Sequence, residues 1–200
     1  MNKPVTDSDF ILASASPRRA QLLQQIGARF SIQPADIDET QHPGESVTHY
    51  VQRMAREKAE TVAQKQPPGG LPVLGADTTV VLDNRVFSKP ADKTAAIATL
   101  RALSGRSHRV LSAIAVVAEG HTEIRLSETS VRFRNIKEQE YEHYWSTGEP
   151  QGKAGAYAIQ GLGAVFVEGI TGSYSGVVGL PLMQTFELFE RFNIACWNAR

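Results

Sequence analysis

The sequence is poor in cysteine: Cys196 is the only one among 200 residues. A single thiol excludes both a disulfide framework and a zinc site built on several cysteines, and it is typical of a reducing compartment. No charge of one sign predominates either, because 21 lysines and arginines balance 21 aspartates and glutamates. This balance argues against broad binding of nucleic acids or anionic membranes, both of which need a strongly basic surface.

Long hydrophobic runs are missing as well, since no stretch approaches the roughly 18 apolar residues of a membrane span. The segment Met1–Phe10 carries Asp7 and Asp9 and has no apolar core, so we expect no signal peptide there. Apolar residues make up 42% of the chain and charged residues 21%, which is typical of a globular protein. We therefore expect a single cytoplasmic domain over residues 1–200, with neither nucleic acid nor a membrane as partner.

Alternating strand and helix patterns predict an α/β fold. Apolar and β-rich runs predict strands at 10–13, 73–82, 85–87, 110–118, 123–133 and 164–167. Capping and breaking residues predict helices from Pro17 to just before Gly27, at 46–64, 92–103 and 137–146, and from Pro181 onward. The last helix should bury Leu182, Phe186, Phe189 and Phe192. Strands alternate with helices first and cluster later, which favours a mixed sheet.

The segment Ser14–Arg19, with the sequence SASPRR, departs from ordinary helix chemistry. Small hydroxyl residues lead into a helix whose first turn holds Arg18 and Arg19. The N–H groups at such a start attract anions, whereas two arginines oppose the helix dipole at a cost of roughly a few tenths of a kcal/mol each. A bound anion would offset this cost; the alternative is that both arginines are solvated.

Two charged residues fall where the pattern predicts burial. Lys58 continues the apolar stripe of the 46–64 helix, and Asp77 interrupts the apolar strand 73–82. A buried charge needs a counter-charge, hydrogen bonds or a metal, although a lysine can instead extend to the surface. Gly75 and Ala76 should leave room beside Asp77 for a ligand.

Carboxylates are dense at 36–39 (DIDE). Together with Asp77 they offer oxygen ligands that suit Mg²⁺ or Mn²⁺ rather than zinc, while a solvated acidic loop is the alternative. The glycine-rich run 151–163 matches neither the Walker pattern nor the dinucleotide fingerprint, so on its own it predicts only tight turns.

Six segments together resemble the Maf family of nucleoside triphosphate pyrophosphatases. They are LASASPRR (12–19), DIDE (36–39), AREKA (55–59), LGADT (74–78), SKP (88–90) and KAGAYAIQG (153–161), in the family's order and spacing. The resemblance implies hydrolysis of a nucleoside triphosphate to the monophosphate and pyrophosphate, with a divalent cation, Mg²⁺ or Mn²⁺. It also implies an elongated mixed β-sheet flanked by helices, similar to the inosine triphosphate pyrophosphatases, with a cleft between two lobes. The last segment resembles the branch that acts on dTTP and UTP rather than on 7-methyl-GTP.

The resemblance further implies roles for individual residues. Asp77 is the expected proton acceptor, directly or as a metal ligand, and Glu39 would join it at the metal. Arg18, Thr78 and Gln160 match the family's specificity positions. The expected phosphate-binding residues are Ser14, Ser16, Arg19, Lys58 and Lys89.

Two functions stay open on the sequence. One is an enzyme that removes dTTP, UTP or modified pyrimidine triphosphates; the other is a nucleotide-binding regulator of cell division and septum formation with little turnover. Gly152 favours the regulator, because many relatives have aspartate there, although Glu149 could substitute for it. Asp77, Glu39 and the cationic residues favour the enzyme. The sequence does not decide between a monomer and a homodimer.

Overall fold

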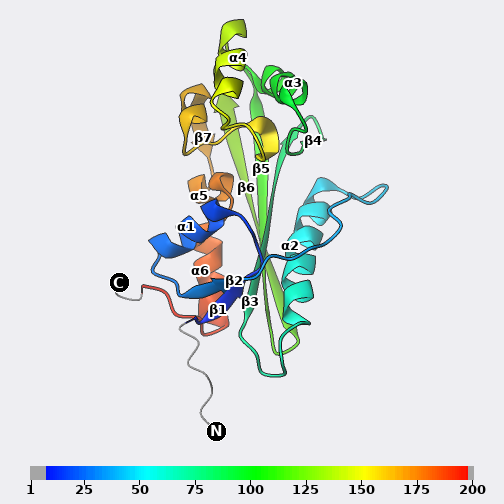
Figure 1. Cartoon of the computed structure of the whole chain (residues 1–200), viewed down its shortest axis with the longest axis vertical. Helices are drawn as coiled ribbons and strands as arrows, with labels where there is room; N and C mark the ends of the chain where they lie inside the picture. Colours follow the sequence, from blue (N-terminus) through cyan, green and yellow to red (C-terminus); the bar gives the residue numbers. More distant parts are fainter. Residues whose placement is uncertain (1–7, 198–200) are drawn as a thin grey trace. The chain divides into compact units, whose positions relative to one another are not determined.

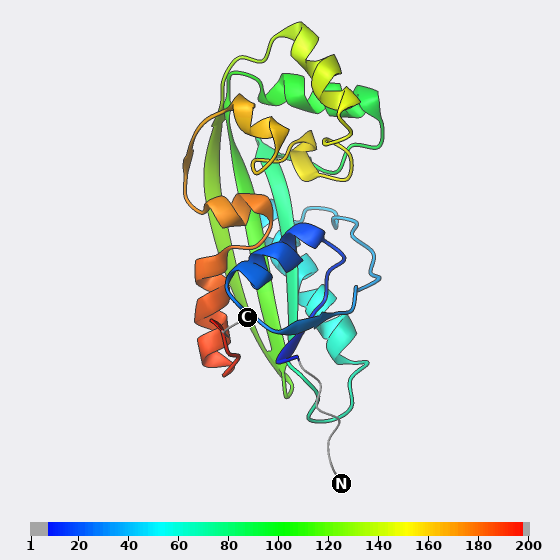
Figure 2. The same ribbon diagram turned by 60° about the vertical axis from the view of Figure 1, so that its left-hand side comes forward.

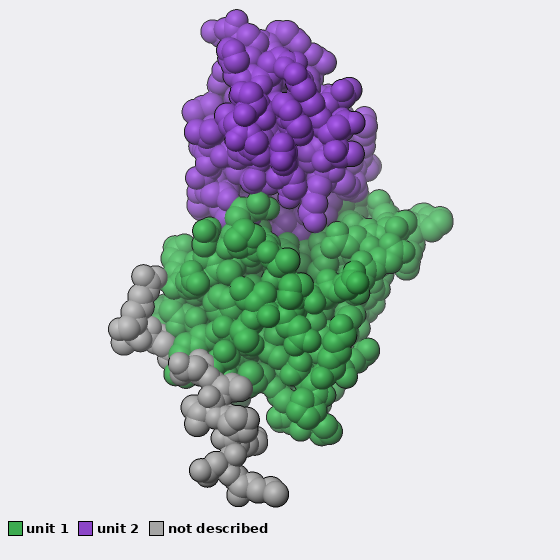
Figure 3. All heavy atoms as spheres, viewed as in Figure 1, with its two compact units in different colours: residues 1–77, 113–126, 179–200 green, residues 78–112, 127–178 purple. Residues whose placement is uncertain are grey.

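The computed structural model describes residues 8–197, in which the chain forms two compact units. Unit 1 comprises residues 1–77, 113–126 and 179–200, and unit 2 comprises residues 78–112 and 127–178 (Figure 3). Residues 1–7, which make up most of the segment where no signal peptide is expected, lie outside the described part. No helix in the described part is long and apolar enough to cross a membrane.

Most elements lie where they are predicted, but the strand Phe30–Ile32 and the helix Tyr174–Val178 were not predicted. The strands are β1 (Phe10–Leu12), β2 (Phe30–Ile32), β3 (Val73–Leu82), β4 (Arg85–Phe87), β5 (Ser107–Ala118), β6 (His121–Phe133) and β7 (Val167–Thr171). The α-helices are α1 (Pro17–Gln25), α2 (Val47–Ala63), α3 (Lys93–Leu103), α4 (Glu138–Ser146), α5 (Tyr174–Val178) and α6 (Leu182–Arg191). Two 3₁₀ helices, η1 (Ala154–Ala156) and η2 (Leu162–Phe166), lie in the glycine-rich region.

The strands form one mixed sheet in the order β2-β1-β3-β5-β6-β7, with β4 paired to β3. Strand β1 runs parallel to β2 and β3, whereas β4 is antiparallel to β3 and β7 is antiparallel to β6. The predicted α/β class, with a mixed sheet flanked by helices, is confirmed. The cleft between two lobes stays a prediction.

In unit 1, helices cover both faces of the strands. Helix α2 lies on one side, and α1 and α6 lie on the other (Figures 1 and 2). Phe10 of β1 is fully buried and contacts Phe189 of α6, with ring centroids 4.7 Å apart. Strand β1 is therefore buried, and its packing fixes the position of the residues that follow it.

In unit 2, helices α3 and α4 pack side by side (Figure 1). An aromatic cluster forms part of its core: the ring of Phe133 lies 4.8 Å from those of both His108 and Tyr157. The rings of Tyr144 and Phe166 lie 5.0 Å apart, edge to face. Tyr157 belongs to the glycine-rich run, so its ring attaches that run to the core of unit 2.

The strand predicted at 164–167 is wrong. Residues Leu162–Phe166 form η2, and the strand begins only at Val167. The carboxylate of Glu149 accepts the N–H groups of Leu162 and Gly163, each at 2.9 Å. These bonds favour a tight turn at this point, and local sequence preference does not reveal them.

The predicted buried face of α6 is also partly wrong. Phe189 is buried, but Leu182, Phe186 and Phe192 are only half-buried. Thr185 and Leu188 are buried in their place. The Thr185 hydroxyl donates to the Pro181 carbonyl at 2.9 Å, so burying this polar residue leaves no hydrogen bond unmade.

Candidate active site

Helix α2 packs directly against strand β3 at Gly75. A Cβ atom added to Gly75 would lie 2.2 Å from the carbonyl oxygen of Ala55 and 2.7 Å from the nitrogen of Ala59. The room predicted for a ligand at Gly75 is therefore occupied by the backbone of α2. Side chains two apart on a strand share a face, so Asp77 also faces α2, where Lys58 lies.

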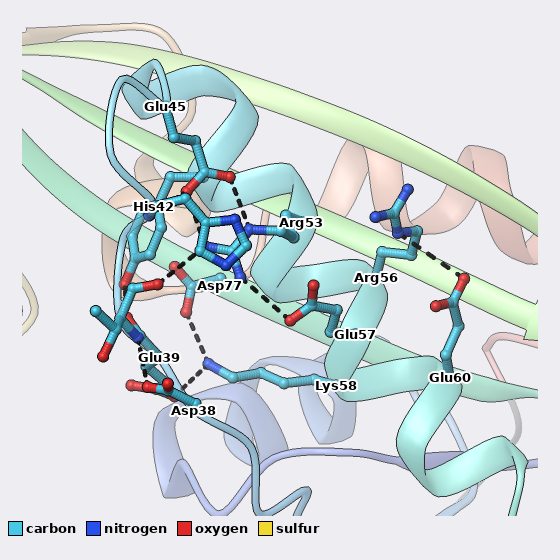
Figure 4. A network of polar contacts seen from close by, with 12 residues as sticks. Asp38, Glu39, His42, Glu45, Arg53, Arg56, Glu57, Lys58, Glu60 and Asp77 are labelled. Atoms are coloured by element: carbon cyan, nitrogen blue, oxygen red, sulfur yellow. Dashed lines mark hydrogen bonds and ion pairs between the residues drawn. The ribbon is translucent and has the colours of Figure 1, made fainter.

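The Lys58 ammonium bridges two carboxylates. It lies 2.8 Å from Asp77 Oδ1 and 2.6 Å from Glu39 Oε1 (Figure 4). The side chains of Lys58 and Asp77 are 9% and 12% exposed, whereas that of Glu39 is 46% exposed. Both charges predicted to be buried are thus buried and paired. The two carboxylates therefore converge on one ammonium.

Arg53 fixes to α2 the loop that carries Glu39. Its guanidinium donates two hydrogen bonds of 2.7 Å to the Glu45 carboxylate and one of 3.0 Å to the Thr40 carbonyl. The Tyr50 hydroxyl, from the same helix, donates to the Glu39 carbonyl at 2.9 Å. The backbone at and just after Glu39 is therefore held by α2, which sets where its carboxylate lies (Figure 4).

The protonation states of Glu45 and Tyr50 favour their hydrogen bonds with Arg53 and with the Glu39 carbonyl. The hydrogen bonds from Arg53 lower the pKa of Glu45 from 4.5 to about 2, so this carboxylate stays ionised. Burial, together with the negative charges of Asp77 and Glu39, raises the pKa of Tyr50 to about 12. Tyr50 therefore keeps the proton that it donates.

Arg19 braces the turn between β1 and α1. Its Nη1 donates to Ser14 Oγ and its Nε donates to the Gly179 carbonyl, each at 2.9 Å. Ser14 Oγ also accepts the Ser16 N–H at 3.2 Å. Ser14 and Arg19 thus lie together, as two residues expected to bind phosphate should. Ser16 is the N-cap residue of α1, but its side chain makes no capping hydrogen bond.

The two arginines of α1 lie in partly buried surroundings. Burial lowers the pKa of both, and at Arg19 the charges of Asp77 and Glu39 oppose this shift. Arginine stays protonated at neutral pH, so the cost of burying these charges would be offset by an anion.

In unit 2, Thr78 joins a chain of hydroxyl groups. Its Oγ1 lies 3.0 Å from Ser112 Oγ, which donates to the Gly176 carbonyl at 2.6 Å. Because the Ser112 proton is directed at Gly176, Thr78 donates to Ser112. Lys89 is exposed in the loop after β4.

The segment that carries Gln160 packs on β3 and β5. Gly155 has a φ of +70°, and a Cβ atom there would lie 2.8 Å from the Val80 side chain. The buried Tyr157 hydroxyl lies 2.9 Å from His108 Nε2. Gln160 itself is exposed, just before η2. Its backbone is therefore anchored while its amide faces solvent.

The carboxylates of Glu39 and Asp77 fit a divalent cation that is held jointly with phosphate. Both reach the same ammonium, so both can reach a common cation. No group of three or more His, Cys, Asp or Glu side chains among residues 8–197 could hold a metal. Mg²⁺ is commonly bound by one or two carboxylates while substrate phosphates complete its shell. The neighbouring Asp38 accepts the Thr40 N–H at Oδ1, at 2.9 Å.

Sequence reasoning missed Arg53, Tyr50 and Glu45. The spacing of Arg53 and Glu57 suggests an i, i+4 ion pair, which the structure shows at 3.3 Å. The stronger pairing with Glu45 depends on the path of the 39–46 loop, which no local pattern reveals.

The sequence matches the Maf-like protein family over residues 9–192. A relative from Alcanivorax borkumensis is 54% identical over 188 residues, covering 94% of this chain and 97% of the relative. One from Nitrosospira multiformis is 54% identical over 190 residues (90% and 92%), and one from Saccharophagus degradans is 48% identical over 199 residues (98% and 95%). All three are named dTTP/UTP pyrophosphatase. The family match and these near-full-length relatives show that this chain belongs to the Maf family.

Proposed function

We propose that this protein hydrolyses dTTP and UTP to the nucleoside monophosphate and pyrophosphate. It thereby clears these and modified pyrimidine triphosphates from the nucleotide pool of the cytoplasm. The observation that carries the proposal is the convergence of Glu39 and Asp77 on the Lys58 ammonium, because it joins a buried base to a cation-binding carboxylate. The names of relatives about half identical to this chain support the choice of substrate.

Asp77 accepts the proton of the attacking water. As water adds to the α-phosphorus, the bond from that phosphorus to the oxygen bridging to the β-phosphate breaks, and pyrophosphate leaves. A carboxylate within reach of the water is suited to take its proton. Asp77 is held in place by strand β3 and by its pairing with Lys58 at 2.8 Å.

Lys58 changes partner when the substrate binds. The Lys58 ammonium lies 2.8 Å from Asp77 Oδ1. Phosphate oxygens compete for the same ammonium through charge-assisted hydrogen bonds. Transfer of Lys58 toward phosphate therefore neutralises part of the substrate's negative charge.

Ser14, Ser16, Arg19 and Lys89 bind the remaining phosphate oxygens. Several cations are needed because a triphosphate carries several negative charges. Glu39 and Asp77 would hold Mg²⁺ or Mn²⁺, and when bound this ion neutralises phosphate charge and polarises the α-phosphate. Arg18, Thr78 and Gln160 recognise the nucleoside, with the Gln160 amide accepting from N3–H and donating to a carbonyl of thymine or uracil.

The regulator with little turnover lacks a supporting observation. Gly152, which favoured it on the sequence, has a φ of +67° and would meet nothing within 4 Å if it carried a Cβ. A left-handed turn is a sufficient reason for glycine at this position. Glu149, three residues earlier, orders the neighbouring backbone through its contacts with Leu162 and Gly163.

The test is pyrophosphate release from dTTP, UTP, CTP, GTP, 7-methyl-GTP and ITP, with and without Mg²⁺ or Mn²⁺. The proposal requires metal-dependent release that is fastest with dTTP and UTP. Tight nucleotide binding without release would reject the enzyme in favour of the regulator. Release led by 7-methyl-GTP would reject the assignment to the pyrimidine branch.

A further inference from the structure

Glu149 holds the backbone just after Gln160. Its Oε2 accepts the Leu162 N–H and its Oε1 accepts the Gly163 N–H, both at 2.9 Å. Burial raises the pKa of Glu149, but hydrogen bonds from Tyr144 and these two amides outweigh it and bring the pKa below its ordinary value. The carboxylate is therefore ionised, and its hydrogen bonds are of the stronger, charge-assisted kind.

Tyr144 holds the backbone just before Gln160. Its hydroxyl donates to Glu149 Oε1 at 2.7 Å and accepts the Ala158 N–H at 3.2 Å. Burial and the neighbouring Glu149 charge raise the pKa of Tyr144 well above its ordinary value, so the hydroxyl keeps its proton. Glu149 and Tyr144 together thus fix the backbone at two positions that flank Gln160.

Two glycines make room for these side chains. A Cβ atom at Gly161 would lie 2.1 Å from Glu149 Oε2, and one at Gly163 would lie 2.6 Å from the Tyr144 hydroxyl oxygen. Neither glycine has a positive φ, so backbone conformation alone does not require them. Their place in the sequence is explained by the carboxylate and hydroxyl that would otherwise be displaced.

We propose that Glu149 and Tyr144 are positioning residues that contribute to base selectivity by fixing the backbone that presents Gln160; this rests on the proposed function. A glutamine amide turned by 180° exchanges its donor and acceptor, and then matches cytosine instead of uracil. Discrimination therefore depends on holding the segment that presents the amide. Gln160 is exposed, and the position of the backbone that presents its amide is held by Glu149 and Tyr144.

The experiment compares UTP with CTP, which share ribose and triphosphate and differ in the base edge. We measure kcat and KM for both nucleotides in the wild type, Glu149→Gln, Tyr144→Phe and the control Glu142→Gln. Glu142 lies on α4 like Tyr144, but its side chain is 57% exposed and pairs with Lys93. Amide hydrogen exchange at Leu162 and Gly163 reports on the backbone independently of activity.

In Glu149→Gln and Tyr144→Phe, the UTP-to-CTP ratio of kcat/KM should fall about tenfold, mainly through the KM for UTP. Exchange at Leu162 and Gly163 should accelerate in Glu149→Gln, and Glu142→Gln should match the wild type in both readouts. A wild-type ratio in folded Tyr144→Phe and Glu149→Gln overturns the inference and leaves the proposed function intact. If the wild type releases no pyrophosphate, both the inference and the proposed function are overturned. If Glu149→Gln does not fold, the Tyr144→Phe ratio decides.

Discussion

The Lys58 ammonium lies 2.8 Å from Asp77 Oδ1, and these side chains are only 9% and 12% exposed. A glycine at position 75 allows helix α2 close enough to strand β3 for this pair to form. The same ammonium lies 2.6 Å from Glu39 Oε1. The pairing gives Lys58 a role in stability beside its proposed role in binding phosphate, and the two roles can be separated by experiment.

Replacement of Lys58 by methionine should destabilise the protein by roughly 3 kcal/mol, because it leaves the buried Asp77 carboxylate without its ammonium partner. Urea denaturation measures this loss. The double variant Lys58→Met/Asp77→Asn should recover most of this loss, since the buried carboxylate charge is then absent. Mn²⁺ should also raise the Tm of Lys58→Met more than that of the wild type, because a cation can take the place of the ammonium. Equal Mn²⁺ effects on the two proteins would argue against a shared cation position.

Replacement of Arg53 by methionine should weaken metal binding without touching a ligand. It removes the two 2.7 Å bonds to Glu45 and the bond to the Thr40 carbonyl, and so loosens the loop that carries Glu39. Loss of such supporting contacts typically lowers metal affinity about 10-fold or more. Titration with Mn²⁺ in the presence of nucleotide measures the affinity. The control is Arg56→Met on the same helix, whose ion pair with Glu60 is exposed and 3.9 Å long; equal affinities in the two variants would refute the role of Arg53.

Replacement of Gly75 by alanine should force α2 away from β3, since the new Cβ would lie 2.2 Å from the Ala55 oxygen. Overpacking of this kind costs about 1–3 kcal/mol, and here the contact is with backbone that cannot rotate away. Thermal unfolding measures the loss. Gly169→Ala is the matched control, because a Cβ there meets nothing within 4 Å. A Tm for Gly75→Ala as high as that of Gly169→Ala would contradict the close approach.

His108 should make the stability of the protein depend on pH. Burial lowers its pKa from 6.5 to about 4, and among residues 8–197 its Nδ1 has no hydrogen-bond partner. Between pH 6.5 and 4 the unfolded chain binds a proton that the folded chain does not. The contribution to stability is therefore complete above pH 6.5 and is lost as pH falls toward 4, by on the order of 3 kcal/mol at most.

Urea unfolding at several pH values checks this dependence. His108→Gln should show a shallower fall in stability between pH 6.5 and 4 than the wild type. Equal slopes in the two proteins would show that His108 does not titrate differently on folding.

Most of the fold could be predicted because its signals are local. The strand 73–82 and the helix that begins after Ser46 were bounded by turn and capping residues that act over a few positions. The burial of Lys58 and Asp77 followed from their places in apolar patterns, and the structure pairs them. Their roles toward phosphate, metal and water rest on family resemblance and stay predictions.

The features that sequence reasoning missed depend on contacts distant along the chain. Residues 164–166 read as strand, but they coil into η2 where the Glu149 carboxylate, 13 or more residues earlier, accepts two backbone N–H groups. No local pattern predicts the ion pair of Arg53 with Glu45, because it depends on the path of the loop that precedes the helix. In each case a side chain pairs with backbone N–H groups or with an opposite charge that a turn brings near, and the sequence does not specify the path of that turn.

The most direct test of the central claim is the turnover of dTTP by Asp77→Asn. Asparagine preserves the size of the side chain but removes the charge and the capacity to accept a proton. We predict that kcat falls by about 10³-fold or more, while the protein still folds and still binds dTTP. A folded Asp77→Asn protein that releases pyrophosphate at the wild-type rate would contradict the assignment of Asp77 as the proton acceptor.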